Sequence, residues 1–252
     1  MPEFWTIIKL LRHILTASLS WVFLVHFVYA QDMDFSPDEI AWLKQHSVIR
    51  ASNEMNYPPF NFNEGGVPKG YSINLLRLLA DRAGLEVEFI SGPEWDEFKQ
   101  MIRAGELDVL LNVDTSPPAP EYVLLTDNYA SMATAVYVSD EELQISRFDD
   151  LRGLRIAVTR GFSTQRYMEQ NQPESELVLE DTLQQAIFAV MEGRADAVVD
   201  DYPAINYIIE QNSLSGLRLA MLSMDTELTA NVAIGVREDQ PVLRDILQKA
   251  LQ

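Results

Sequence analysis

The sequence of 252 residues contains no cysteine and only three histidines. Without cysteine the chain has no disulfide, no thiolate metal site and no cysteine nucleophile. The histidines, at positions 13, 26 and 46, are too far apart to form a zinc-binding pair on one helix face. A Ser-His-Asp triad would depend on His46, which ends a short predicted helix. We therefore expect no metal site and no cofactor.

Basic residues are also scarce, because 19 Lys and Arg stand against 38 Asp and Glu. The resulting net charge of −19 would repel nucleic acid and anionic lipid, so neither is expected as a partner. Apolar residues make up 47% of the chain, which is ordinary for a globular protein. The length allows one large domain or two modest lobes.

Residues 1–30 have the pattern of a secretory signal peptide. Lys9 and Arg12 precede an apolar run over residues 14–30, and Val28 and Ala30 suit a cleavage site after Ala30. The run is also just long enough for an uncleaved membrane anchor. Both interpretations place the remaining chain outside the cytoplasm, in the periplasm or tethered to the inner membrane.

A short helix is predicted in the segment 31–47 that follows. Ser36 can cap it, Pro37 suits its first turn, and Glu39 completes a capping box. Beyond it, strands and helices alternate. Strands are predicted at 48–55, 85–91 and 107–113, with helices at 73–84 and 94–105 between them, and the same order returns from residue 154 to residue 201.

Two rounds of this βαβαβ order predict an α/β fold of two lobes, each a mainly parallel sheet flanked by helices. Lobe 1 is predicted to comprise residues 48–132 plus 226–252, and lobe 2 residues 133–225. Two chain crossovers would join the lobes and leave a cleft between them. Ligands bind at the carboxyl ends of parallel strands and between domains, and hinged lobes close on them.

The order and spacing of several motifs resemble the extracytoplasmic solute-binding proteins of family 3, which have the periplasmic-binding-protein type II, or Venus-flytrap, fold. The motifs are NYPPFNF, GYSINLL, GELDVLLN, LLTDNY, LRGLRIAVTRGFST and EGRADAVVDDYPAINYII. They extend from about residue 49 to residue 247. The resemblance implies a binding protein, not an enzyme, whose partners are a small ligand and a membrane permease or a sensor output module.

The resemblance also implies which residues line the cleft. These are Tyr57, Phe60, Asn112, Asp114, Arg160, Ser163, Thr164 and Asp201. An aromatic ring at Tyr57 would pack on the ligand, and a carboxylate at Asp201, or less favourably at Asp200, would bind an ammonium group through charge-assisted hydrogen bonds.

Several of these positions have a structural alternative. Phe60 also fits the core, Ser163 a plain helix N-cap, and Arg160 a surface ion pair with a carboxylate. Glu54 fits either a solvated loop or the mouth of the cleft. Trp95 and Tyr71 are predicted to pack rather than to contact a ligand.

One position departs from the family pattern. Amino-acid binders resembling this chain carry an arginine after the third strand that grips the ligand's carboxylate, whereas the turn SPPAPEY places Ala119 there. Asp114 adds a negative charge nearby. The sequence therefore predicts that the cleft has lost its usual cation, for which Arg160 of the other lobe could compensate. It favours a polar ligand that is cationic, neutral or amino-acid-like, or no small ligand at all.

The role of the domain stays open at this point. Uptake through an ABC-type permease and sensory input to a membrane-bound histidine kinase or diguanylate cyclase both fit the resemblance, and the helix at 36–46 is similar to the front of such sensors. A periplasmic dehydratase on the same fold is the enzymatic alternative, although it would want the arginine that is missing.

Overall fold

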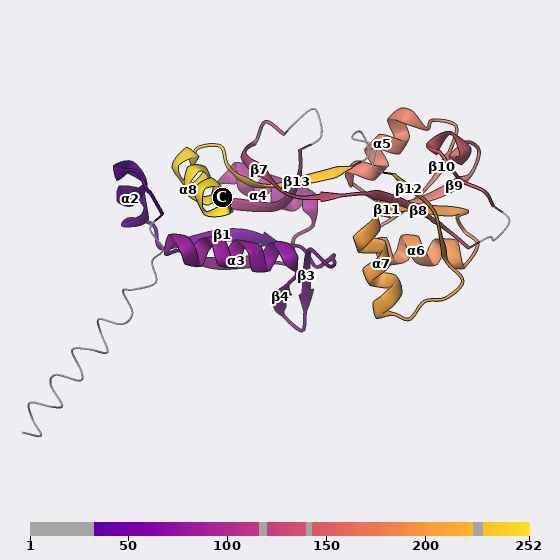
Figure 1. Ribbon diagram of the computed structural model, residues 1–252, viewed down its shortest axis with the longest axis horizontal. Coiled ribbons are helices and arrows are strands. Elements are labelled where there is room, and N and C mark those ends of the chain that lie inside the picture. Colours follow the sequence, from indigo (N-terminus) through magenta and orange to yellow (C-terminus); the bar gives the residue numbers. More distant parts are fainter. Residues whose placement is uncertain (1–32, 116–119, 140–142, 224–228) are drawn as a thin grey trace, which may run out of the picture.

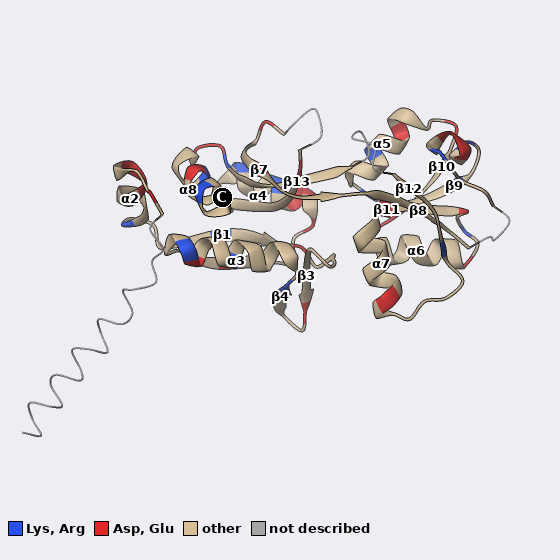
Figure 2. Cartoon of the chain, in the orientation of Figure 1, with Lys and Arg blue, Asp and Glu red and all other residues tan. Residues whose placement is uncertain are grey.

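The computed structural model describes residues 33–115, 120–139, 143–223 and 229–252, which form two lobes joined end to end (Figure 1). The predicted signal peptide and Ala119 lie outside these residues. Within the same ranges, no helix combines the length and the apolar character needed to cross a bilayer. Asp and Glu occur on both lobes (Figure 2), in keeping with the acidic composition.

The sheet of lobe 1 has four strands in one direction and one against them. Its strands lie in the order β5 (Glu86–Ser91), β1 (Val48–Asn53), β6 (Val109–Asp114), β13 (Ala230–Arg237) and β7 (Val123–Met132). β1 is parallel to both β5 and β6, whereas β13 runs antiparallel to β6 and β7. Val109 and Leu111 pack into one helical layer and Leu110 into the other, so both faces are buried.

Helices cover both faces of this sheet. α3 (Tyr71–Ala83) and α8 (Pro241–Leu251) share one apolar cluster, and α4 (Trp95–Ala104) packs on the other face. α2 (Pro37–Leu43) lies against α8, where Glu39 pairs with Lys249 at 2.6 Å. The predicted capping box is confirmed, because the Glu39 carboxylate accepts a hydrogen bond from the Ser36 N–H and Ser36 Oγ accepts one in return.

The sheet of lobe 2 repeats this arrangement of directions. Its strands lie in the order β10 (Glu176–Glu180), β9 (Arg155–Thr159), β11 (Ala197–Asp201), β8 (Thr134–Val138) and β12 (Arg218–Ser223). α6 (Leu183–Met191) and α7 (Tyr202–Gln211) cover one face, and α5 (Ser163–Asn171) and the 3₁₀ helix η2 (Phe148–Leu151) the other. α7 and β12 were not predicted; Pro203 stands in the first turn of α7, where proline is compatible with a helix.

The chain passes between the lobes where β7 gives way to β8. β7 ends at Met132 and β8 begins at Thr134, while Ala230 of β13 pairs with Met132 on the return path. The extended segments therefore lie side by side between the lobes (Figure 1). The two-lobe α/β fold predicted from the sequence is thus the fold observed.

A small sheet attaches to lobe 1 beside the crossover. It consists of β2 (Asn56–Tyr57), β3 (Asn61–Glu64) and β4 (Val67–Lys69), and the predicted hairpin turn at Gly65 and Gly66 is confirmed. Gly70 has a φ of +117° and leads into α3. Its backbone lies so close to the loop before β3 that a Cβ added at Gly70 would collide with the Phe60 carbonyl. Gly70 therefore holds the loop that carries Tyr57 and Phe60 against lobe 1.

We expect Gly70→Ala to lower the free energy of unfolding by about 3 kcal/mol, because an unfavourable φ and displacement of the Phe60 backbone each cost about 1–3 kcal/mol. Gly84→Ala is the matched control, since Gly84 also has positive φ (+75°) but has nothing within 4 Å of the added Cβ. Urea unfolding measures both. Equal losses in the two variants would contradict a role for the close approach at Gly70.

Candidate ligand-binding site

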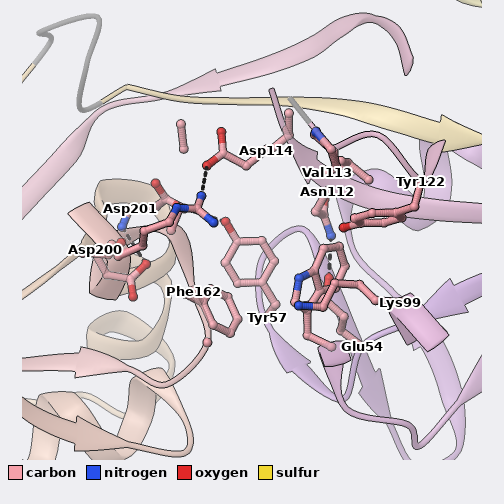
Figure 3. A pocket seen from close by; sticks show the side chains of 18 of the residues that line it. Glu54, Tyr57, Lys99, Asn112, Val113, Asp114, Tyr122, Phe162, Asp200 and Asp201 are labelled. Carbon is pink, nitrogen blue, oxygen red and sulfur yellow. Dashed lines mark hydrogen bonds and ion pairs between the residues drawn. The ribbon is translucent and has the colours of Figure 1, made fainter. Parts of the chain in front are cut away.

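A cavity of about 490 Å³ lies between the lobes and receives side chains from both. Its wall combines the carboxyl ends of β1 and β6 in lobe 1 with those of β9 and β11 in lobe 2. Figure 3 shows Tyr57 in the middle, with Asp200, Asp201 and Phe162 on one side and Glu54, Asn112 and Tyr122 on the other. The volume is in the range of sites for small organic molecules.

The lobe 1 wall is built on a network around Asn112, whose φ of +57° is a left-handed conformation that asparagine tolerates better than most residues. Asn112 Oδ1 accepts hydrogen bonds from Ser72 Oγ (2.6 Å) and the Tyr129 hydroxyl (2.7 Å). Asn112 Nδ2 donates to Glu54 Oε1 at 2.9 Å. The network fixes the Glu54 carboxylate at the cavity, directly after β1.

Glu54 is hard to charge in this position. Removal from bulk water raises the pKa of Glu54 to about 7, although hydrogen bonds from Asn112 and Asn61 act in the opposite direction. Of the two uses predicted for Glu54, the structure therefore places it at the cleft rather than on a solvated loop.

The lobe 2 wall ends in two adjacent carboxylates. Asp200 is held by the Asp201 N–H (2.8 Å) and Thr159 Oγ1 (3.3 Å). Asp201 Oδ2 accepts a hydrogen bond from the Tyr57 hydroxyl at 2.5 Å, which joins the two lobes directly. Asp201 lines the cavity, and its Oδ1 has no hydrogen-bond partner in the described part of the chain.

Burial raises the pKa of both aspartates above the ordinary range, and for Asp201 the neighbouring Asp200 charge raises it further. The Tyr57 hydrogen bond acts in the opposite direction on Asp201. With Glu54, the cavity therefore contains three carboxyl groups that lose their protons only near neutral pH. A cation placed among them would favour their ionised forms.

Three basic side chains line the same cavity, although the arginine usual after the third strand is missing. Lys99 and Arg103 come from α4 and Arg166 from α5, two helices on which Figure 2 shows basic positions. Arg166 lies 3.8 Å from Asp114, across the gap between the lobes. The missing loop arginine therefore does not leave the cavity without positive charge.

Six of the eight predicted site residues line this cavity: Tyr57, Asn112, Asp114, Ser163, Thr164 and Asp201. Phe60 instead lies in the core beside the Tyr57 ring, at a centroid distance of 5.6 Å. Ser163 is the first residue of α5, and its N-cap alternative is wrong because Phe162 holds the extended cap conformation.

Arg160 belongs to a second, adjoining cavity of about 430 Å³. Its guanidinium pairs with Asp181 at 3.2 Å and its side chain is 57% exposed, which matches the surface ion pair considered as its alternative role. Tyr57 and Phe162, with ring centroids 5.8 Å apart, contribute to both cavities.

The basic residues and Tyr122 were missed in the sequence, although a signal for some of them exists. Trp95, Lys99 and Arg103 recur every fourth residue and so share one face of α4, beside the face that buries Phe98. Trp95 also lines the cavity, contrary to its assignment to packing alone.

Comparison with known proteins identifies the family. The family model described as bacterial extracellular solute-binding proteins, family 3, matches residues 49–252. The virulence sensor protein BvgS of Bordetella bronchiseptica is 25% identical over 218 residues, which are 86% of this chain but 17% of that protein. ABC transporter arginine-binding protein 1 of Escherichia coli is 25% identical over 197 residues, or 77% of this chain and 80% of that protein.

Solved structures agree with these relatives. A histidine kinase sensor domain with similarity to periplasmic binding proteins superposes with a TM-score of 0.76 and 25% identity, covering 82% of this chain and 90% of that one. The periplasmic VFT2 domain of Bordetella pertussis BvgS gives a TM-score of 0.75 and 25% identity, covering 86% and 92%. The relatives reported are binding proteins and sensor domains.

The buried carboxyl groups predict how stability depends on pH. A carboxyl whose pKa is raised by folding binds more protons in the folded state, so its contribution to stability is lost as pH rises from the unfolded pKa through the folded one. We expect the free energy of unfolding of the ligand-free protein to fall by at least about 1 kcal/mol between pH 5 and pH 7. Urea unfolding at fixed ionic strength measures this fall.

Glu54→Gln should flatten this dependence, because it removes one of the groups concerned. Glu174→Gln, at an exposed loop position, is the control and should keep the wild-type slope. A stability that rises over this pH interval would show that the three carboxyl groups are already ionised in the folded protein at pH 5.

Proposed function

Because the chain belongs to the bacterial extracellular solute-binding proteins of family 3, we propose that it captures a small polar ligand with a cationic group between its lobes. Asp201 carries this proposal. Asp201 lines the cavity, its Oδ1 has no hydrogen-bond partner in the described part of the chain, and the adjacent Asp200 raises the negative charge that a cation would meet. An ammonium or guanidinium group there would form a charge-assisted hydrogen bond with the ionised Asp201 carboxylate, and the carboxyl proton would be released.

The remaining wall supports this assignment. Tyr57 and Phe162 present aromatic rings to the cavity, and rings of this kind attract cations as well as apolar stems. Asn112, Asp114, Ser163 and Thr164 add polar groups from both lobes. A ligand touching both walls would favour the closed arrangement of the lobes, because it makes its full set of contacts only there.

Two biological settings fit this capture, and both place the domain outside the cytoplasm. The arginine-binding relative supports delivery of the ligand to an ABC-type membrane transporter. The likeness to BvgS and to a histidine kinase sensor domain supports a second setting, sensory input to a membrane-bound signalling protein. Catalysis has no comparable support, since these relatives bind or sense.

One structural feature favours sensing as the second candidate. α2 precedes β1 and is tied to α8 by the Glu39–Lys249 pair and by a 3.3 Å hydrogen bond from Trp42 to Gln240. Segments from both ends of the described chain thus meet on lobe 1. Genes for a permease and an ATPase beside this one would favour uptake, whereas a reading frame continuing into a membrane helix would favour sensing.

A thermal-shift screen tests the capture of a cation. We expect lysine, arginine or putrescine to raise the melting temperature more than glutamate does, since a ligand at 100 times its Kd stabilises by about 2.7 kcal/mol. Affinity for the active cation should increase from pH 6 to pH 8, because the carboxyl groups lose protons over that range. A larger shift with glutamate would contradict the proposal.

Replacement of Asp201 tests the anchor itself. Asp201→Asn should weaken cation binding about 10- to 100-fold, which corresponds to a charge-assisted hydrogen bond of about 1.5–3 kcal/mol. Asp181→Asn is the matched control, because Asp181 is paired with Arg160 away from the first cavity. Isothermal titration calorimetry measures the Kd of the cation for each variant. Equal Kd values for Asp201→Asn and Asp181→Asn would show that the cation binds elsewhere.

A further inference from the structure

We propose that Tyr129 is a positioning residue of the ligand site, because its hydroxyl holds Asn112 in the conformation that presents an amide to Glu54. The inference rests on the proposed function, since it concerns how the lobe 1 wall of the cation-binding cavity is built. Tyr129 lies outside the lining of both cavities, so it acts on a ligand only through Asn112 and Glu54.

Two strands of lobe 1 depart from regular pairing with β13 at this point. On β7 the register shifts within residues 128–130, which leaves Tyr129 as the extra residue of a β-bulge. On β6 a shift of the same kind lies within residues 110–113 and includes Asn112, whose φ is positive. A bulge re-aims a side chain, and such features recur beside functional sites. Here the two irregular positions, on strands either side of β13, bring their side chains together.

The Tyr129 hydroxyl uses both of its hydrogen-bonding capacities on the same residue. It accepts a hydrogen bond from the Asn112 N–H at 3.0 Å and donates one to Asn112 Oδ1 at 2.7 Å. Ser72 Oγ, which lies 3.0 Å from this hydroxyl, donates a second hydrogen bond to Asn112 Oδ1 at 2.6 Å. The backbone and the side chain of Asn112 are thus fixed together, in a left-handed conformation that persists only where the surroundings impose it.

This arrangement decides which end of the Asn112 amide faces the cavity. Because two hydroxyl groups donate to Oδ1, that atom must point towards them, and Nδ2 points the other way. Nδ2 then donates to Glu54 Oε1 at 2.9 Å (Figure 3). A hydrogen bond of this kind favours the ionised carboxylate, which is the form that attracts a cation.

Other charges act on Glu54 by separate routes. Burial raises the pKa of Glu54, the hydrogen bond from Asn112 acts against this rise, and the charge of Glu94, at the N-cap of α4, adds to it. Burial also raises the pKa values of Tyr57 and Tyr129, so both are neutral near pH 7. Neither Glu94 nor Tyr57 is hydrogen-bonded to Tyr129 in the described part of the chain. Loss of the Tyr129 hydroxyl therefore reaches Glu54 through the intervening asparagine.

Tyr129→Phe tests this role in the ligand-free protein, because it removes the hydroxyl and keeps the ring. We expect the midpoint of the Glu54 titration to rise by about 0.5–1 pH unit, since a loosened Asn112 amide stabilises the ionised carboxylate less. Carbon-13 NMR of labelled glutamate side chains measures the midpoint, and the signal lost in Glu54→Gln assigns it. Tyr137→Phe is the matched control: Tyr137 donates a 2.9 Å hydrogen bond to Asn206 within lobe 2, and its loss should leave the midpoint unchanged.

Cation affinity gives a second measure, with lysine, arginine and putrescine as probes at pH 7. Tyr129→Phe should raise the Kd about three- to tenfold, the effect of one hydrogen bond, whereas Tyr137→Phe should leave it unchanged. In a Glu54→Gln background, Tyr129→Phe should have no further effect on the Kd, because the hydroxyl acts through the Glu54 carboxylate.

Urea unfolding of each variant shows whether the fold is retained. Should Tyr129→Phe not fold, Ser72→Ala provides the same test, because it removes the other hydroxyl that donates to Asn112 Oδ1. Ser72→Ala should move the Glu54 midpoint in the same direction as Tyr129→Phe.

The possible outcomes separate the positioning role from the proposed function. A Glu54 midpoint that stays or falls in Tyr129→Phe would overturn the positioning role, and so would equal changes in Tyr129→Phe and Tyr137→Phe, because the effect would then follow from stability alone. An unchanged Kd, or an equal loss of affinity with and without Glu54→Gln, would also overturn it. If none of the three probes binds while the midpoint rises as expected, the positioning of Glu54 stands and cation capture is refuted.

Discussion

The withdrawal of three carboxyl groups from water between two lobes is the constraint on which the site depends. Charging Glu54, Asp200 and Asp201 is unfavourable there, so their pKa values rise and the empty cavity holds protons near neutral pH. The same low-dielectric setting strengthens the attraction between these carboxylates and any cation that enters the cavity. The ligand-free fold therefore keeps three carboxyl groups where their ionisation is unfavourable, and a bound cation would favour their ionised forms. Ligand binding is thus linked to the protonation of these groups.

The architecture explains why these groups meet. Parallel strands place their carboxyl ends at one edge of each sheet, so Glu54 after β1 and Asp201 at the end of β11 both point to the space between lobes. Tyr57 ends β2, just before the loop at Phe60 that Gly70 approaches closely, and the Tyr57 hydroxyl donates a hydrogen bond to Asp201. The Tyr57–Asp201 hydrogen bond between the lobes thus depends on the close approach of Gly70 to Phe60 within lobe 1.

Much of this was accessible from sequence, for physical reasons. Apolar runs such as residues 107–113 require a sheet covered on both sides, which gave the α/β lobes, and the resemblance to family 3 then indicated Asn112 and Asp201 at the binding edge. The cationic wall was not accessible in the same way. Lys99, Arg103 and Arg166 lie on helices, where basic residues are usually solvated, and only the positions of α4 and α5 on either side of the cavity bring these side chains to its wall.

The arginine missing from one loop position does not decide the charge of the cavity. The absence of a basic residue at one position determines the charge of a cavity only if no other helix or strand places a basic side chain in that cavity. Here helices from both lobes do, and their basic side chains lie among the carboxyl groups of the cavity wall. Acidic and basic side chains occur on both walls, with Glu54 and Lys99 in lobe 1 and Asp201 and Arg166 in lobe 2. A ligand that pairs with groups on both walls makes its full set of contacts only when the lobes are closed, so the ligand and the closed arrangement stabilise each other.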